Sequence, residues 1–238
     1  RCRAGDDDET IVIDAFDYIE YSKILSQPEA DAEELVREAL AHAINRKQII
    51  DGAMFGYGTP IGTHFPPQNP AYVDLRGLSK YDPALSKKLL AEAGYSNGFS
   101  VGMIVRQAQE RLEMAQSIQN TFAKAGIKVK ITVGTGKQIL GIYRARKHDI
   151  YLGAWGPDYP DPNTNASTFA WNGNNSDAAG LTGVLAWRNS WFDPKITKET
   201  EAAMVENNRA KRAKMYEATQ RQFLKVAPFA IMFQKIEQ

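Results

Sequence analysis

The chain has 238 residues, of which 29 are Lys or Arg and 28 are Asp or Glu. That length is enough for one large domain or two small ones with a sizeable core. The near balance of charge lacks the basic footprint that phosphate backbones and anionic membranes require, so nucleic acid is not an expected partner.

The start of the chain, RCRAGDDDET, has no apolar centre of the kind found in signal peptides. No apolar run in the sequence is long enough to cross a bilayer. The single cysteine, Cys2, excludes an internal disulfide framework. These features predict a mature, truncated or cytosolic chain.

A strand and a long helix are the first predicted elements. Residues 11 to 19, IVIDAFDYI, are rich in β-branched and aromatic residues and predict a strand. Asp31 is then the expected N-cap, with Glu34 three residues later, of a helix over residues 33 to 51. The apolar residues at helical spacing are Leu35, Val36, Ala39, Leu40, Ala43 and Ile44.

A Gly- and Pro-rich stretch, GYGTPIGTHFPPQNPAY, predicts a long loop. The next helix is expected over residues 82 to 93. Asp82 stands at its N-cap, Pro83 at the tolerated first position, and Gly94 where the chain leaves the helix.

From residue 99 onward, strands alternate with helices. Strands are predicted at about 100 to 105, 128 to 133 and 149 to 154, with helical patterns between them. This alternation predicts parallel pairing of all three strands in one sheet of an α/β layer. The remaining sequence predicts two more helices and a last strand, FAIMFQ.

Ligands of such sheets bind beyond the carboxyl ends of the strands. That edge is expected to hold Arg106, the GTG at 134 to 136, and the proline-stiffened stretch AWGPDYPDPN at 154 to 163. Arg106 would there meet a ligand carboxylate, or remain an ordinary solvated arginine.

The two aspartates of the proline-rich stretch have different predicted roles. Asp161 precedes Pro162, which is the arrangement of an N-cap followed by proline at the first helical position. Asp158 has no such structural role, so its carboxylate is a candidate receptor for an ammonium group, with Trp155 and Tyr159 supplying aromatic surface. The alternative is a solvated loop aspartate beside a core Trp155.

Several other kinds of site are not supported by the sequence. VGTGKQ fails as a phosphate-binding loop because Ile131 and Gln138 stand where that motif needs Gly and Ser or Thr, so a plain turn is expected. His42, His64 and His148 lack metal-ligand spacing and are expected on the surface or in loops. No nucleophile elbow is present. No metal or cofactor is therefore expected.

Five segments in order carry a resemblance to a known family. LVREALAHAINRKQII, GYGTP, YDPALSKKLLAEAGY, AWGPDYPDPN and RAKMYEATQRQFLKVAPFAIMF resemble the carboxyl-terminal half of the extracellular solute-binding proteins of dipeptide and oligopeptide ABC importers. The resemblance covers residues 33 to 234. The chain departs from the family pattern over residues 163 to 193 and at FDPKITKETEAAM.

The resemblance implies a lobe of the type II periplasmic-binding-protein fold, an α/β lobe whose mixed sheet has helices on both faces. Residues 1 to 32 would be an amino-terminal segment near the hinge and residues 33 to 234 the second ligand-binding lobe, with the first lobe largely absent. The family implies a periplasmic or extracellular location and a membrane permease as partner. In its peptide-binding members the aspartate matching Asp158 pairs with the ligand's α-amino group.

The predicted function is therefore a non-catalytic lobe that binds short peptides or related amines. Family members for opines, sugars, haem and nickel complexes leave the ligand class open. One rival is an α/β enzyme that uses Asp158 as acid or base, for which no second catalytic group is evident. The other is a stand-alone protein-interaction domain.

Overall fold

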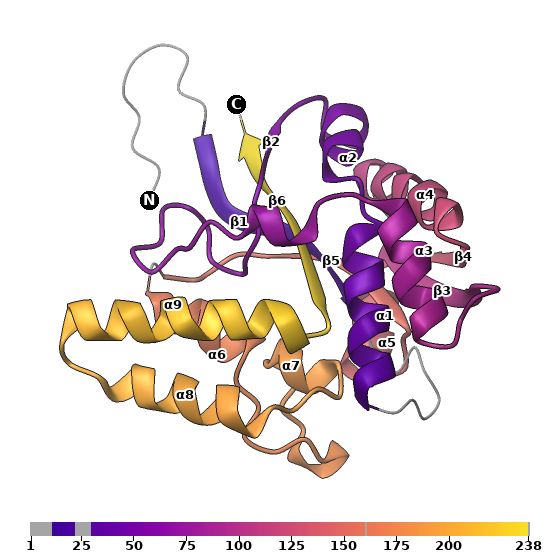
Figure 1. The fold of residues 1–238 in the computed structure, drawn as a ribbon. Helices are drawn as coiled ribbons and strands as arrows, with labels where there is room; N and C mark the ends of the chain where they lie inside the picture. Colours follow the sequence, from indigo (N-terminus) through magenta and orange to yellow (C-terminus); the bar gives the residue numbers. More distant parts are fainter. Residues whose placement is uncertain (1–10, 22–29, 160, 238) are drawn as a thin grey trace.

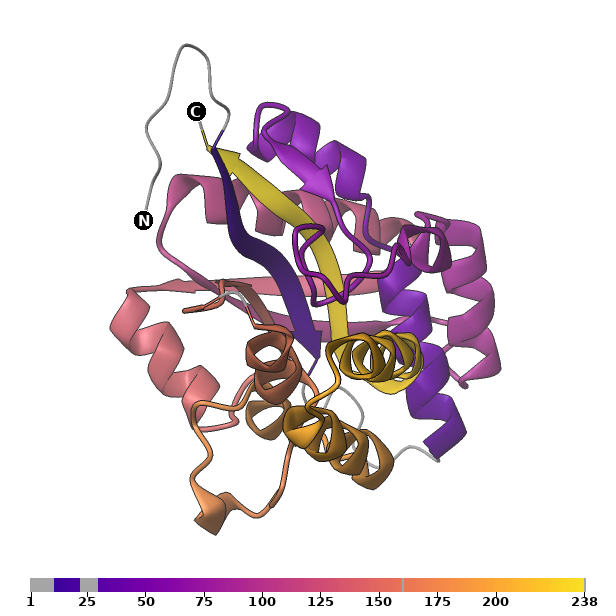
Figure 2. The ribbon, with the colours of Figure 1, turned by 90° about the vertical axis from the view of Figure 1, so that its left-hand side faces the viewer.

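The structure is a computed structural model that describes residues 11–21, 30–159 and 161–237 (Figure 1). Its centre is a mixed six-stranded sheet, and helices cover both faces of that sheet (Figure 2). The predicted α/β lobe, a mixed sheet with helices on both faces, is confirmed.

The strands are β1 (Ile11–Tyr21), β2 (Gly58–Pro60), β3 (Phe99–Arg106), β4 (Ile127–Gly134), β5 (Ile150–Trp155) and β6 (Phe229–Glu237). The α-helices are α1 (Ala30–His42), α2 (Arg46–Ala53), α3 (Pro83–Glu92), α4 (Gln109–Lys124), α5 (Gly136–Arg144), α6 (Pro162–Phe169), α7 (Leu185–Arg188), α8 (Pro194–Val205) and α9 (Arg209–Val226). Short 3-10 helices are η1 (Arg76–Ser79) and η2 (Asp177–Ala179).

The strand order is β2-β6-β1-β5-β3-β4. As predicted, β3, β4 and β5 are parallel neighbours, because α4 and α5 return the chain to the same end of the sheet. β1 runs antiparallel between β5 and β6, and β2 is antiparallel to β6. The described ends of the chain meet at one edge, where Ile11 pairs with Glu237.

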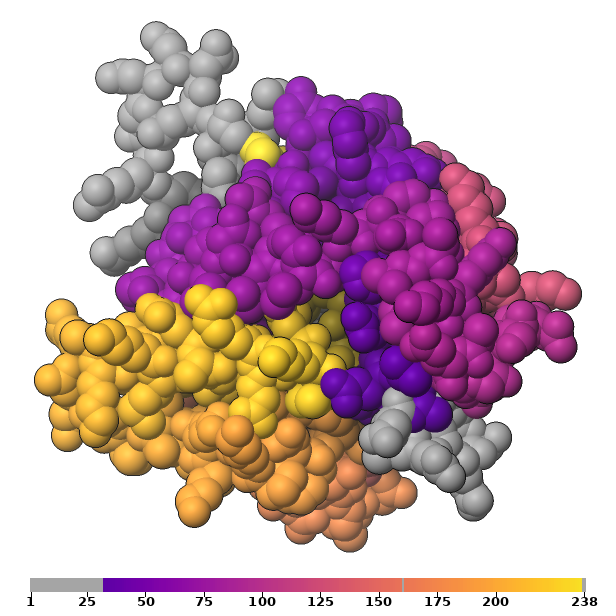
Figure 3. All heavy atoms as spheres, viewed as in Figure 1, coloured from indigo at the N-terminus to yellow at the C-terminus, as the bar shows by residue number. Residues whose placement is uncertain are grey.

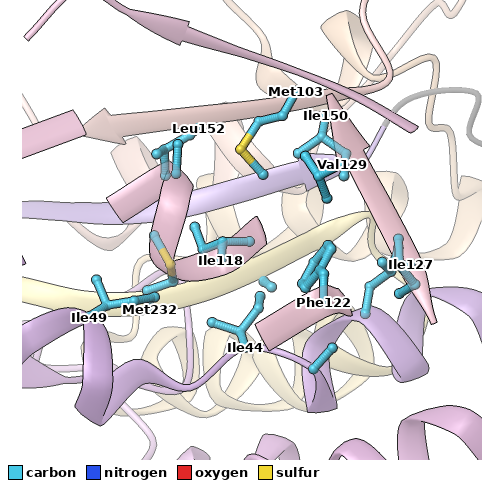
Figure 4. Close-up of a cluster of buried hydrophobic side chains, with 14 of the residues drawn as sticks. Ile44, Ile49, Met103, Ile118, Phe122, Ile127, Val129, Ile150, Leu152 and Met232 are labelled. Atoms are coloured by element: carbon cyan, nitrogen blue, oxygen red, sulfur yellow. The ribbon is translucent and has the colours of Figure 1, made fainter. Parts of the chain in front are cut away.

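One face of the sheet packs against α1, α2, α3 and α4 (Figure 4). α4 buries Met114, Ala115, Ile118, Thr121 and Phe122, which recur at helical spacing. From the strands, Met103 and Val105 of β3 join the same cluster as Ile150 and Leu152 of β5. Side chains alternate between faces along a strand, so the residues between them point to the other side.

The opposite face packs against α5, α6, α7, α8 and α9, and α8 and α9 lie side by side at the surface of the molecule (Figure 3). Ile104 and Tyr151, the alternate residues of β3 and β5, lie in this second cluster. Aromatic rings dominate it: Phe169 lies edge-on to Phe229, and Phe229 stacks on Phe223 at 5.5 Å. Both faces are therefore covered, which explains why these strands are apolar on both sides.

The prediction of one helix over residues 33 to 51 is wrong. The structure has two helices, α1 and α2, because Asn45 begins a new one: its side chain accepts a hydrogen bond from the Gln48 amide at 3.1 Å. Asp31 lies inside α1 rather than at its N-cap. The predicted loop, residues 56 to 72, contains the short strand β2, and the 3-10 helix η1 follows it.

Other local predictions are confirmed. Asp82 caps α3 by accepting from the Ala84 and Leu85 amides, and Gly94 leaves that helix at φ 88°. The GTG segment ends β4 and starts α5, where Thr135 and Gln138 form a reciprocal capping box.

Candidate functional site

The carboxyl edge of the parallel strands brings together the segments predicted to meet there. Arg106 at the end of β3 lies opposite Gly134 at the end of β4. β5 runs beside β3 in register, with Met103 opposite Ile150, so the chain after Trp155 continues past the same edge. The prediction that Arg106 and the stretch after Trp155 lie at one edge of the sheet is confirmed.

Trp155 is the last residue of β5, and the loop that carries Asp158 follows it directly. Its side chain is half-buried and its ring meets Phe169 edge-on at 5.3 Å. Trp155 packs against the aromatic cluster of the α5–α9 face. The ring is therefore partly a core residue, as the structural alternative expected, and partly exposed at the edge.

Asp158 and Tyr159 are exposed beyond Trp155, Tyr159 with 56% of its surface accessible. The loop that carries them is fixed at its far side, because the Tyr159 carbonyl accepts from the Asp161 amide at 2.9 Å and from the Thr164 hydroxyl at 3.4 Å. Within the described residues no hydrogen bond or ion pair engages the Asp158 carboxylate. A charged acceptor thus stands on a restrained loop and faces outward.

Asp161 is structural, as predicted, and its role is larger than a cap. Its carboxylate accepts from the Asn163 amide at 2.8 Å and forms two hydrogen bonds to the Arg212 guanidinium at 2.9 and 3.0 Å. These bonds from Arg212, and that from Asn163, hold the pKa of Asp161 below its usual value. Arg212 in turn lies over the Tyr216 ring. The pair fastens the loop to α9.

Arg212 was not predicted from the sequence. It lies 51 residues from Asp161, inside a helix rich in Lys and Arg, and nothing in the local pattern distinguishes it from its cationic neighbours. Arg106 is exposed at the strand end, a position compatible with either role proposed for it.

A shallow recess of about 600 Å³ lies at the same edge but on the α2 and α4 face of the sheet. The recess is lined by Phe55, which has 78% of its surface exposed, and by Tyr57. Lys235 and Glu110, which form an ion pair at 3.1 Å, also line it. Sequence reasoning did not single out these aromatic residues. They add exposed apolar surface to this edge of the molecule.

His64 and His148 lie in loops, as the prediction allowed, whereas His42 lies in α1, and none of the three is exposed at the surface. His42, His64 and His148 retain 8%, 0% and 5% of their surface. Burial among Phe65, Phe169 and Phe223 lowers the pKa of His64 to about 3. Aromatic rings surround His64 and His148 and bury them, which the polarity of a single residue does not reveal.

Among the described residues, no group of three or more His, Cys, Asp or Glu side chains is placed to hold a metal ion. In the same part of the chain, no helix has both the length and the apolarity needed to cross a membrane.

Comparison with known proteins gives a consistent family signal. The family model described as bacterial extracellular solute-binding proteins, family 5 Middle, matches residues 25–177. Di/tripeptide-binding protein 1 of Pseudomonas aeruginosa is 28% identical over 190 residues, covering 78% of this chain and 34% of the relative. Heme-binding protein A of Haemophilus influenzae is 31% identical over 194 residues, covering 78% of this chain and 33% of the relative.

A solved structure confirms the prediction of a lobe with the type II periplasmic-binding-protein fold. The dipeptide binding protein of a Pseudoalteromonas species, in complex with Met-Leu, superimposes with a TM-score of 0.84 at 25% identity. The superposition covers 96% of this chain and 44% of that protein. The chain thus spans about a third of the length of the curated relatives it matches, and somewhat less than half of the solved structure.

Proposed function

Because this chain belongs to the bacterial extracellular solute-binding proteins of family 5, we propose that it is the second ligand-binding lobe of a receptor for an ABC importer. The proposed ligands are short peptides or related solutes with a free ammonium group. The proposed partners are the membrane permease and the first lobe of the same receptor, and the proposed location is periplasmic or extracellular.

The observation that carries this proposal is the setting of Asp158. Its carboxylate is exposed at the carboxyl edge of the parallel strands and has no partner within the described residues. Its loop is held by Trp155 on one side and by Asp161 on the other. A fixed acceptor loses little conformational entropy when it binds, and a charge-assisted hydrogen bond to an ammonium group is among the strong ones.

The aromatic neighbours of Asp158 fit the same ligand. Tyr159 offers an exposed ring and Trp155 a partly exposed one, next to the carboxylate in sequence. Such rings attract a cation through their π faces and cover apolar parts of a ligand. Arg106, at the same edge, is proposed to meet a ligand carboxylate.

The pairing of β1 with β6 is compatible with the proposed two-lobed receptor. β1 and β6 pair at Ile11 and Glu237, at the edge that carries Asp158. Two adjacent strands leading toward this edge are suited to connect the lobe to a partner lobe, so that the ligand is enclosed between both. The proposal keeps the predicted division of the chain. Residues 1 to 32, which include β1, form an amino-terminal segment near the hinge, and residues 33 to 234 form the second ligand-binding lobe.

We propose binding rather than catalysis at this site. General acid–base chemistry needs a second group in hydrogen-bond reach of the reacting atoms. Among the described residues, no hydrogen bond or ion pair joins a titratable side chain to the Asp158 carboxylate. The restrained, single carboxylate suits recognition of a charged group.

The test replaces Asp158 by Asn in the complete receptor. The change keeps the side-chain size and removes the charge, so a buried ammonium group would lose its counter-ion. We expect a loss of about 2 to 5 kcal/mol, on the order of thirtyfold to several thousandfold in affinity. Calorimetric titration with unblocked di- and tripeptides, Met-Leu included, measures this loss, and their N-acetylated forms should bind the unchanged receptor weakly.

Glu34→Gln is the matched control, because it also removes one exposed negative charge and lies on α1 away from this edge. Asp161→Asn is unsuitable, since it would break the pair with Arg212. Equal, small effects of Asp158→Asn and Glu34→Gln would show that the ligand is recognised elsewhere.

A further inference from the structure

A second recess lies away from the Asp158 loop, where the start of α2 meets η1 and the end of β2. It has a volume of about 200 Å³. Its apolar lining includes Ile44, Pro60 and Ile61. We call it the Arg46 recess, after one of the side chains that line it.

The charge of the Arg46 recess has one sign. Four cationic side chains line it, and no Asp or Glu is among the lining residues. They are Arg46, Lys47, Arg76 and Lys80. The whole chain has a net charge of only +1, so this concentration is local. Such a site attracts an anion and repels a cation.

Arg46 is held in place by the fold. Its Nε donates to the Ile231 carbonyl at 2.9 Å and one terminal nitrogen donates to the Ser79 carbonyl at 2.8 Å. These bonds join α2 to β6 and to η1, so the guanidinium charge is positioned before any ligand arrives. Preorganised charge reduces the entropy lost on binding.

Two of the four cations have acidic partners on exposed side chains. Arg76 pairs with Asp74, and Lys47 pairs with Asp51. In each pair both side chains are about half exposed or more, where ion pairs contribute little and exchange readily. Among the described residues, no ion pair engages Lys80.

The start of α2 adds backbone donors at this place. α2 begins at Arg46, so the positive end of the helix faces the recess, and its first turn contains no acidic residue.

We propose that the Arg46 recess is a binding site for a phosphate group. Lys47 and Lys80 provide charges on exposed side chains, and Arg46 provides a charge that its bonds to two backbone carbonyls hold in place. The group is either free phosphate or the headgroup of an anionic phospholipid, which share this chemistry. The site is independent of the peptide-binding proposal, because it uses none of the same residues.

The test titrates the chain with inorganic phosphate at constant ionic strength and follows phosphorus NMR line width and the thermal midpoint. Chloride at equal ionic strength is the reference. We expect saturable binding that Lys80→Gln weakens by about tenfold, the loss of one charge-assisted contact. The Lys80 side chain is exposed, and His42 Nδ1 contacts the Lys80 backbone carbonyl, which the substitution keeps. The variant is therefore expected to fold.

Lys87→Gln is the matched control, because Lys87 is an exposed lysine on α3 outside the recess. It should change phosphate affinity less than twofold, a shift of roughly 0.4 kcal/mol. Co-sedimentation with phosphatidylcholine vesicles, with and without phosphatidylglycerol, separates the two sources. Binding to the anionic vesicles alone, with the same dependence on Lys80, assigns the site to a headgroup. No saturation by either probe, or equal effects of the two lysine variants, would overturn the proposal.

Discussion

Asp161 and Asp158 are three residues apart and differ in what surrounds them. Asp161→Asn keeps a capping side chain but loses the two bonds to Arg212. Because this pair is partly exposed, we expect a loss of about 0.5 to 1.5 kcal/mol in the free energy of unfolding. Urea denaturation at neutral pH measures it, and Asp158→Asn should leave the midpoint unchanged.

The same pair predicts a dependence on pH. The native pKa of Asp161 lies below its ordinary value of 3.8, so the pair stabilises the fold above that value. The stabilisation is lost as the pH falls through the native pKa. The unfolding free energies of the parent and of Asp161→Asn should therefore converge in acid, and a constant gap would contradict this account.

His64, unlike Asp161, is buried without a charge in the native state. Its native pKa is about 3 and its ordinary value 6.5, so below pH 6.5 the unfolded chain binds a proton that the native chain does not. This residue therefore lowers the unfolding free energy by about 1.4 kcal/mol per pH unit as the pH falls from 6.5 toward 3. In His64→Phe, which keeps an aromatic ring among Phe169 and Phe223, that contribution should disappear. Parallel unfolding curves of parent and variant between pH 7 and pH 5 would refute the burial of a neutral imidazole.

At the scale of elements, two glycines let the connections into β3 and β4 cross. A Cβ at Gly98 would lie 1.9 Å from the Gly126 carbonyl oxygen, and Gly98 has φ +68°. Gly98→Ala should cost at least about 2 kcal/mol of stability, because backbone must move. Gly141→Ala is the control: it lies in α5 with open space, and should stabilise by about 0.5 to 1 kcal/mol. Thermal unfolding of both variants checks the contrast, and equal shifts would mean that the crossing tolerates a side chain.

Elements with their own start and stop residues could be predicted from the sequence. α3 is an example, since Asp82, Pro83 and Gly94 mark both ends. The break between α1 and α2 was missed because the apolar spacing continues across Asn45, and only the cap reveals the new helix. The position of Asp158 beyond the carboxyl end of β5 could be predicted because strands and helices alternate along the sequence.

Contacts between distant segments could not be predicted. Buried Arg146, at φ 58°, bonds to Ser190, Asn175 and Asp177 and lies over the Trp187 ring, which fixes the 172–191 segment. A lone arginine after a helix gives no local sign of such partners. Arg212 was missed for the same reason.

For the whole molecule, the carboxyl edge forms one wall of the proposed site. Asp158 and Tyr159 are exposed on it, whereas effective small-molecule sites bury most of their ligand. We expect this chain alone to bind a peptide at least about a hundredfold more weakly than the complete receptor, because the proposed first lobe would supply the facing wall. Calorimetry on both proteins with the same dipeptide tests this. Equal affinities would favour a self-contained domain.

The position of β1 has a consequence for how the chain acquires its fold. β1 is the first described strand, yet its sheet neighbours are β5 and β6, which begin at Ile150 and Phe229. During synthesis at the usual rates, β1 waits on the order of ten seconds for β5 and longer for β6. Its closure of the sheet is a non-local event of high contact order, which is slow and leaves an apolar, β-prone segment unpaired meanwhile. Chaperone binding to nascent chains should therefore concentrate on residues 11–21 until β6 has been made.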